Sequence, residues 1–117
     1  MKRYFFFDID GTLTTPLTAD YPDSAREAVR RLQEKGNFVA IASGRLQADA
    51  VDVAEELGID SVISDGGNGV TCCGKILYHE GLPLEDCFRL LGEIDGKKHP
   101  WAVTTENKKQ RKTKYDD

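Results

Sequence analysis

Residues 4–12, with the sequence YFFFDIDGT, decide the fold class. The first four side chains are all aromatic, with no alternation of apolar and polar residues. Such a run is typical of a strand that is buried on both faces, as in a parallel sheet packed between helices. The run ends at Asp8, and the Asp10-Gly11 pair marks the passage from a strand into a loop. We therefore expect a buried strand whose carboxyl end carries two carboxylates.

Helix and strand patterns alternate after this first strand. Apolar side chains recur on one face between Asp23 and Lys35, and Gly36 stands at the C-cap position. A β-α-β-α-β order produces a parallel sheet with right-handed, helix-covered connections. The predicted fold class is α/β, with a Rossmann-like parallel sheet and flanking helices. The predicted elements are a helix over 23–35, a strand over 38–42, a helix over 46–57 and a strand over 59–63.

The pattern changes after residue 69. Two short apolar runs flank residues 73–75 and predict a small hairpin. A helix is predicted over residues 83–94, and residues 101–103 begin a strand. Residues 106–115 contain five Lys or Arg, so we expect a solvated or frayed end, with phosphate or nucleic-acid contact as the alternative. On this pattern the chain divides into residues 1–79 and residues 80–117.

The composition excludes several classes of protein. The 117 residues include 16 basic and 20 acidic side chains, which gives a net charge of −4. No run approaches the roughly 18 apolar residues of a membrane span, and the apolar run before Asp8 is too short for a signal peptide. The acidic balance argues against a nucleic-acid binder, and three cysteines without regular spacing favour a reducing compartment. We expect a cytoplasmic protein with no membrane or nucleic-acid partner.

Polar side chains follow each of the three predicted core strands. Asp8 and Asp10 follow the first strand, Ser43 follows the second, and residues 65–68 follow the third. Ligands bind outside the carboxyl ends of the strands in open parallel sheets. We therefore expect these polar groups to form a single site.

The two aspartates suit metal-assisted acid–base chemistry. Asp8 and Asp10 are two residues apart, so on an extended backbone their side chains start on the same face. Two ionised carboxylates repel unless a cation lies between them or one of them keeps a proton. The pair therefore fits a hard divalent ion such as Mg²⁺ together with a general acid, and a carboxylate can also attack phosphorus directly. The structural alternative is that Asp10-Gly11 forms a turn and Asp8 a cap.

Three segments resemble motifs of the haloacid dehalogenase-like superfamily of phosphohydrolases. Residues 6–14 look like the first motif, and residues 42–45 resemble the second. Residues 63–70, with the hairpin beyond them, are similar to the Cof-type branch, in which an Asn-Gly loop leads from a Rossmann-like core into an inserted α/β cap. The resemblance implies that residues 1–79 form the first half of the core and that residues 80–117 begin a cap, which is incomplete.

The resemblance also implies roles for the two aspartates. Asp8 is implied to be the nucleophile and a Mg²⁺ ligand. Asp10 is implied to protonate the leaving alcohol and then to activate water, with its backbone carbonyl on the metal. Because dehalogenation needs no acid for the leaving group, Asp10 implies phosphate-ester chemistry. The implied substrate is a small phosphorylated metabolite.

Four further residues are candidates for contact with the substrate. Ser43 is implied to hydrogen-bond the transferring phosphoryl group, with Gly44 beside it. Arg45 either contacts the substrate or only covers the start of the following helix. Asn68 is either a contact on the substrate side or a turn residue that tolerates positive φ.

The second half of the family pattern is absent from this sequence. The third motif is a lysine and the fourth is an acidic pair that completes the metal site, and both normally follow the cap. Two functions are therefore considered. The first is a Mg²⁺-dependent phosphatase that works through an aspartyl-phosphate. The alternative is a catalytically incomplete fragment that binds Mg²⁺ or phosphate weakly, or only self-associates.

The resemblance also predicts self-association. In the complete family fold, later core strands pair with the far side of the first strand. Without them, residues 4–7 are expected to form an exposed sheet edge, which is a template for pairing with another chain. We expect a homo-oligomer that forms through this edge.

The remaining His and Cys residues predict no further site. His79 and His99 are expected on the surface. Cys72 and Cys73 lie in the predicted hairpin, where adjacent side chains point to opposite faces, so no shared metal site is expected. Cys87 is expected to pack into the core from the apolar stripe of its helix.

Overall fold

The computed structural model describes residues 1–15, 20–108 and 111–114. The chain divides into two compact units, Met1–His79 (unit 1) and Glu80–Asp117 (unit 2). That the first is part of a core and the second part of a cap stays a prediction. Unit 1 contains, in chain order, β1 (Tyr4–Phe7), the turn η1 (Ile9–Leu13), α1 (Asp23–Glu34), β2 (Phe38–Ala42), α2 (Gln47–Glu56), β3 (Val62–Ser64), the turn η2 (Asp65–Gly67), β4 (Gly69–Cys72) and β5 (Lys75–His79).

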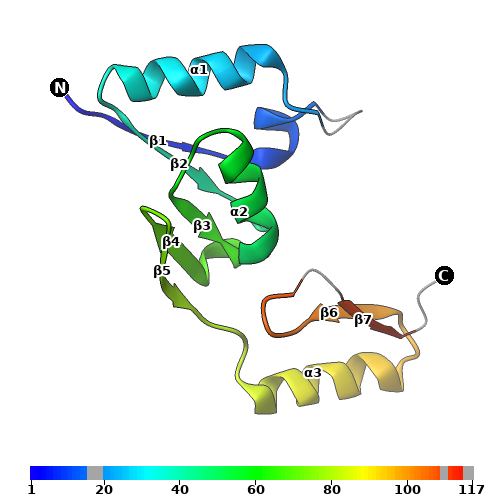
Figure 1. Ribbon diagram of the computed structural model, residues 1–117. Helices are drawn as coiled ribbons and strands as arrows, with labels where there is room; N and C mark the ends of the chain where they lie inside the picture. The colour runs from blue at the N-terminus through cyan, green and yellow to red at the C-terminus, as the bar shows by residue number, and fades with distance from the viewer. Residues whose placement is uncertain (16–19, 109–110, 115–117) are drawn as a thin grey trace. The chain divides into compact units, whose positions relative to one another are not determined.

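Unit 1 is built on one five-stranded sheet with the order β1-β2-β3-β4-β5 (Figure 1). β2 pairs in parallel with β1 on one side and with β3 on the other. β3 pairs antiparallel with β4, and β4 with β5. The predicted α/β fold with a parallel sheet is confirmed, and the predicted hairpin extends that sheet at one end. β1 stands at the other end of the strand order, as expected.

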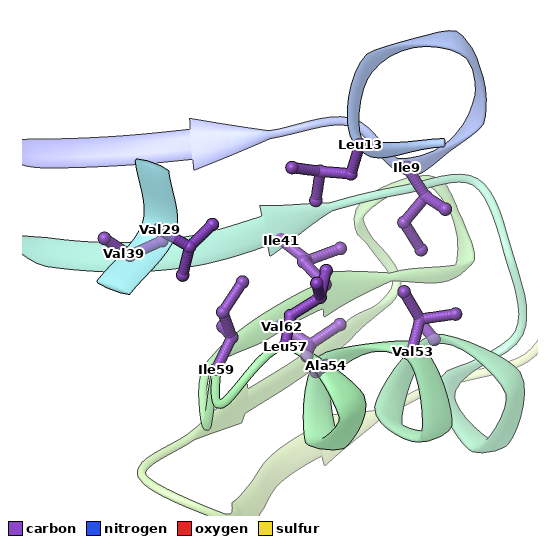
Figure 2. Close-up of a cluster of buried hydrophobic side chains, with 11 residues drawn as sticks. Ile9, Leu13, Val29, Val39, Ile41, Val53, Ala54, Leu57, Ile59 and Val62 are labelled. Carbon is purple, nitrogen blue, oxygen red and sulfur yellow. The ribbon is translucent and has the colours of Figure 1, made fainter. Parts of the chain in front are cut away.

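Both helices of unit 1 pack on the same face of the sheet. The parallel strands follow one another in order, so right-handed connections place α1 and α2 on one side. Figure 2 shows Val29 of α1 and Val53 of α2 directed toward the side chains of β2. This packing forms the core of the unit. Its buried members are Ile9, Leu13, Val29, Val39, Ile41, Ala50, Val53, Ala54, Leu57, Ile59 and Val62.

The opposite face of β1 is exposed, so the expectation of a strand buried on both faces was wrong. Tyr4 is 64% exposed and Phe6 54%, whereas Phe7 packs against the core. On the exposed face, the Phe38 ring lies 5.6 Å from the Tyr4 ring and 6.2 Å from the Phe6 ring, centroid to centroid. The aromatic run has the hydrophobicity of a doubly covered strand, but both helices of unit 1 lie on the other face.

The third strand begins later than predicted. Residues 59–61 precede β3, although Ile59 is 3% exposed and the Ser61 carbonyl accepts a hydrogen bond from the Ile41 N–H at 3.0 Å. The apolar side chain at position 59 therefore reflects packing against the core rather than membership of the sheet.

β3 and β4 approach closely at Gly69. Gly69 lies directly opposite Ser64 in the sheet register. A Cβ atom at position 69 would lie 2.3 Å from Ser64 Oγ and 2.9 Å from Asp65 Oδ2. Glycine is therefore required at this position because the space beside it is already filled.

Unit 2 contains α3 (Leu84–Gly96), β6 (Trp101–Thr104) and β7 (Arg111–Lys114). β6 and β7 form an antiparallel pair. α3 has no fully buried residue, and Cys87, expected in the core, is half-buried. Among the described residues, no helix has both the length and the apolar character to span a membrane.

β7 shows that part of the basic segment is ordered, which corrects the expectation of a frayed end. Residues 111–114 pair with β6 after a connection in which Glu106 and Asn107 adopt φ values of 56° and 54°. Antiparallel pairing uses backbone groups and does not require apolar side chains. Residues 109, 110 and 115 of this segment lie outside the described residues.

We predict that Gly69→Ala lowers the free energy of unfolding of unit 1 by about 1–3 kcal/mol, because the added methyl displaces Ser64 and Asp65. Gly44→Ala is the matched control within unit 1, because a Cβ at position 44 meets nothing within 4 Å. Its effect is expected to stay within about 0.5 kcal/mol. Urea unfolding followed by circular dichroism measures both, and equal effects would contradict the close approach.

Candidate active site

Asp8 and Asp10 lie just after β1, on either side of a fully buried residue. Ile9 is 0% exposed and belongs to the core, whereas both aspartates are exposed. The backbone is extended at Asp8 and Asp10, and both side chains are open to solvent although Ile9 between them is buried. The Thr14 N–H and hydroxyl both donate to the Ile9 carbonyl, at 3.1 and 3.2 Å, after a turn at Gly11. The loop is therefore anchored from its buried side.

Ser43 lies at the carboxyl end of β2, beside the end of β3. The Ser43 side chain is buried, and its Oγ accepts a hydrogen bond from the Arg45 N–H at 3.0 Å. The Asp65 N–H donates to the Arg45 carbonyl at 2.8 Å, and the Gly66 N–H donates to the Ser43 carbonyl at 3.3 Å. The loops after β2 and β3 are thus joined by backbone hydrogen bonds.

Arg45 connects the loop after β2 to the aspartate loop after β1. Its Nη2 lies 2.6 Å from Asp10 Oδ1, and its Nε lies 3.0 Å from Asp10 Oδ2. A two-point contact of this kind between a guanidinium and a carboxylate is strong and directional. Arg45 Nη1 also lies 3.4 Å from Asp49 Oδ2 on α2. Arg45 therefore covers the start of α2 and also joins the first two motif segments.

This ion pair determines the charge on Asp10. Hydrogen bonds from Arg45 lower the pKa of the Asp10 carboxyl, burial raises it in part, and the positive charge of Arg45 lowers it further. The same contacts raise the pKa of Arg45. In this arrangement Asp10 is ionised at neutral pH, so it can accept a proton but has none to donate.

Asn68 does not join the other candidates through any contact that the described residues show. It is exposed, its φ is −86°, and its N–H donates to the Asp65 carbonyl at 3.3 Å. Of the two alternatives for Asn68, a turn residue at positive φ is therefore ruled out, and a contact with the substrate stays a prediction. The positive φ values fall earlier in the loop, at Asp65 (54°), Gly66 (66°) and Gly67 (110°).

Asp65 holds together three segments around the candidate site, a role that the sequence did not predict. Its Oδ2 accepts hydrogen bonds from Ser64 Oγ at 2.8 Å and from the Gln47 N–H at 3.1 Å. The same oxygen lies 2.9 Å from His79 Nε2. His79, expected on the surface, is thus partly buried, with a side-chain exposure of 23%. Gly69 of β4 pairs with Ser64 of β3 on one side and with His79 of β5 on the other, which brings His79 close to Asp65. No spacing in the sequence indicates this contact.

The oxygen atoms at the end of β1 are of the kind that Mg²⁺ prefers. Magnesium is usually held by one or two carboxylates, with water and substrate phosphate completing its shell. Asp8 offers an exposed carboxylate and Asp10 a backbone carbonyl, while the Asp10 carboxylate is paired with Arg45. In the described part of the chain, no group of three or more His, Cys, Asp or Glu could hold a metal ion. The residues present therefore fit a magnesium ion that keeps several water ligands.

We predict that Arg45→Ala raises the pKa of Asp10, because the variant lacks the cation and the two hydrogen bonds that stabilise the carboxylate. As the pH falls, Asp10 then takes up its proton at a higher pH than in the original chain. NMR titration of the Asp10 side-chain carbonyl measures this. Arg89→Ala, which removes a surface pair with Asp86, is the control and leaves Asp10 unchanged. An unchanged Asp10 titration in Arg45→Ala would contradict the assignment.

Comparison with known proteins agrees with the resemblance found in the sequence. The chain is 39% identical over 106 residues to the Bacillus subtilis protein named "Putative phosphatase YkrA", covering 91% of this chain and 41% of that relative. A solved hypothetical protein from Geobacillus kaustophilus is 37% identical with a TM-score of 0.78, covering 95% of this chain and 42% of that one. The HAD subclass IIB sugar phosphatase BT4131 is 27% identical with a TM-score of 0.77, covering 97% and 44%.

This chain thus spans about two fifths of the length of each of these relatives. A family model of haloacid dehalogenase-like hydrolases matches residues 5–114, which is nearly the whole sequence. The chain therefore belongs to the haloacid dehalogenase-like hydrolases.

Proposed function

We propose that this chain carries the nucleophile side of a Mg²⁺-dependent phosphatase site that acts on a small phosphorylated metabolite in the cytoplasm. The observation that carries the proposal is the exposed Asp8/Asp10 pair, held beside the Ser43 loop by the contact between Arg45 and Asp10. A family of hydrolases and relatives named as phosphatases support the same reaction class.

In the proposed reaction, Asp8 is the nucleophile. One oxygen of the Asp8 carboxylate attacks the phosphorus, and the bond between phosphorus and the ester oxygen breaks. The product is an aspartyl-phosphate, and the leaving alcohol takes a proton from Asp10. A water molecule then attacks the same phosphorus and loses its proton to Asp10. Free phosphate and the Asp8 carboxylate result, so the displacement is divided into two easier steps.

The contact with Arg45 must change for Asp10 to act as an acid. With Arg45 bound, Asp10 is ionised and suited only to the second step, in which it accepts a proton. A phosphate dianion is a competing two-point partner for a guanidinium. We propose that the substrate phosphate draws Arg45 away, which raises the pKa of Asp10 and lets the carboxyl carry the proton that the leaving group needs.

Ser43 and Gly44 are suited to hold the phosphoryl group. The Ser43 oxygen accepts the Arg45 N–H, so its own O–H proton is available to a phosphate oxygen. A Cβ at Gly44 would meet nothing within 4 Å, which leaves room for a phosphate beside the backbone. Donors placed in advance stabilise the charge that develops during phosphoryl transfer. A bound Mg²⁺, held by Asp8 and the Asp10 carbonyl, would neutralise part of the phosphate charge.

We predict that Asp8→Asn lowers Mg²⁺-dependent hydrolysis of p-nitrophenyl phosphate by at least about 100-fold, because the amide is a poor nucleophile and a poor metal ligand. Asp86→Asn, on the surface of α3, is the matched control and is expected to keep full activity. Hydrolysis that survives Asp8→Asn would show that Asp8 is not the nucleophile.

A magnesium titration followed by NMR separates the two proposed functions. Binding is expected to move the amide signals of residues 8–11 first in the original chain, and not in Asp8→Asn. Such shifts without any hydrolysis would favour the incomplete fragment that binds Mg²⁺ weakly. Shifts confined to the acidic helices would place the metal elsewhere.

We also propose that this chain forms a homo-oligomer through β1. β1 is the last strand in the order of the described sheet, and Tyr4 and Phe6 are more than half exposed. A flat aromatic edge is a template for strand pairing with a second copy. Burial of one phenylalanine side chain contributes about 1.5–3 kcal/mol, so several of them offset a large part of the entropy lost on association.

We predict that Phe6→Lys weakens self-association by roughly 10- to 100-fold, because it puts a charge where the proposed interface would bury an exposed ring. Phe88→Lys is the matched control, because Phe88 is 66% exposed on α3. Light scattering across a concentration series measures both variants. A monomeric original chain, or equal effects of the two variants, would contradict an interface at β1.

A further inference from the structure

Two thiols lie side by side at the tip of the β4–β5 hairpin. Cys72 is the last residue of β4, Cys73 is the next residue, and their Sγ atoms are 3.6 Å apart. Adjacent side chains of a strand point to opposite faces, which is why no shared site was expected. Cys73 and Gly74 instead adopt φ values of 53° and 80°. The alternation therefore ends at Cys72, and the turn brings the second thiol beside the first.

The turn that pairs the thiols is held in place by neighbouring backbone and hydroxyl groups. The Cys73 N–H donates to Ser61 Oγ at 3.2 Å, and Ser61 is only 2% exposed. The Gly74 N–H donates to the Asp60 carbonyl at 2.8 Å. Both thiols are free, with Cys73 exposed and Cys72 half-buried. The hydrogen bonds of the turn thus hold the two sulfur atoms side by side before any ligand binds.

The separation of the sulfur atoms suits a shared bound atom better than a disulfide. A disulfide requires an S–S length of about 2.05 Å, so the two atoms would have to approach by about 1.5 Å against the hydrogen bonds of the turn. A bridging atom bonded to both sulfur atoms leaves them unbonded to each other, so it requires a much smaller movement from the observed contact of 3.6 Å.

In the described part of the chain, this tip offers two sulfur ligands and no third metal-binding side chain. No cluster of three or more metal-binding side chains exists among the residues that the structure describes. A structural zinc site takes four protein ligands, so two thiols alone hold zinc weakly. A trivalent arsenical that carries one organic group needs only two more bonds. We propose that Cys72 and Cys73 form a chelating site for a trivalent arsenical.

The proposed binding step balances without an oxidant or reductant. An arsenoxide R–As=O and two thiols give R–As(S-Cys72)(S-Cys73) and one water molecule. Two arsenic–sulfur bonds form and the arsenic–oxygen bond breaks, while both thiol protons leave with the oxygen. Arsenic stays trivalent throughout. The thiol pair shares no residue with the candidate phosphatase site, so the two can function independently.

The raised pKa of Cys73 favours binding by both thiols together over modification of one thiol alone. The hydrogen bond with Cys72 raises the pKa of Cys73, and the charges of Cys72 and Asp60 raise it further, although Lys2 opposes this. A thiol with a raised pKa is a poor nucleophile by itself. Stable capture is therefore expected only when both sulfur atoms take part.

The experiment treats the full, reduced chain with phenylarsine oxide and measures the adduct by intact mass spectrometry. One phenylarsenic group per chain is expected, with loss of one water. The adduct should survive an excess of a monothiol and be removed by a dithiol. Cys72→Ala and Cys73→Asn are each expected to weaken binding by at least about 100-fold, because each loses the second attachment point. Asparagine is chosen because it tolerates positive φ at position 73.

Cys87→Ala is the matched control and should bind phenylarsine oxide as the original chain does. Circular dichroism spectra that match the original chain show that each variant is folded. No adduct in the original chain, an equal adduct in Cys72→Ala or Cys73→Asn, or loss of the adduct in Cys87→Ala would each overturn the proposal. A disulfide between Cys72 and Cys73 under reducing conditions would overturn it as well.

Discussion

The burial of Ile9 between two aspartates is the constraint on which the candidate site depends. A fully buried aliphatic side chain at this position cannot leave the core without a cost of several kcal/mol. Ile9 thereby anchors the loop in the core, while Asp8 and Asp10 on either side of it stay exposed to solvent. The Thr14 hydrogen bonds to the Ile9 carbonyl then hold the loop from beneath. Hydrophobic packing thus anchors the loop that carries both exposed aspartates.

The second constraint comes from the way the loops are joined. Backbone hydrogen bonds tie the Ser43 loop to the Asp65 loop, and Arg45 ties the Ser43 loop to Asp10. The first connection is fixed by backbone atoms, whereas the second depends on side chains that solvent and phosphate can reach. The site therefore combines a rigid frame with one contact that can be exchanged. In the proposed reaction, this combination suits Asp10, which would both give and accept a proton.

Local sequence patterns predicted the elements that local forces control. The helix patterns, the β-α-β-α-β order and the small hairpin follow from periodicity and from glycine positions, and all appear in the structure. Contacts between distant segments were harder to foresee. The Asp65–His79 contact depends on the pairing of β3, β4 and β5, and the Cys72–Cys73 approach depends on positive φ in a turn.

The sequence also could not predict which face of β1 is exposed to solvent. An aromatic run shows how much apolar surface a strand carries, but not which elements cover it, so the open face of Tyr4 and Phe6 was missed. β7 formed in a segment without an apolar pattern, because its pairing with β6 relies on backbone groups. The approach of the Asp10 loop to the Ser43–Arg45 loop was predictable in outline, since the ends of neighbouring parallel strands share one edge. The two-point contact between Arg45 and Asp10 was not, because it depends on side-chain conformation rather than on strand order.

The exposed aromatic face has a thermodynamic consequence. The heat capacity of unfolding grows with the apolar area that is buried in the folded state and becomes hydrated on unfolding. Rings that are already hydrated, such as Tyr4 and Phe6, add little to that change. The free energy of unfolding of the isolated chain should therefore curve less with temperature than that of a sheet of equal length with both faces covered. If a binding partner covered this face, the heat capacity of unfolding would rise. Calorimetry would detect that rise even if no strand or helix changed its shape.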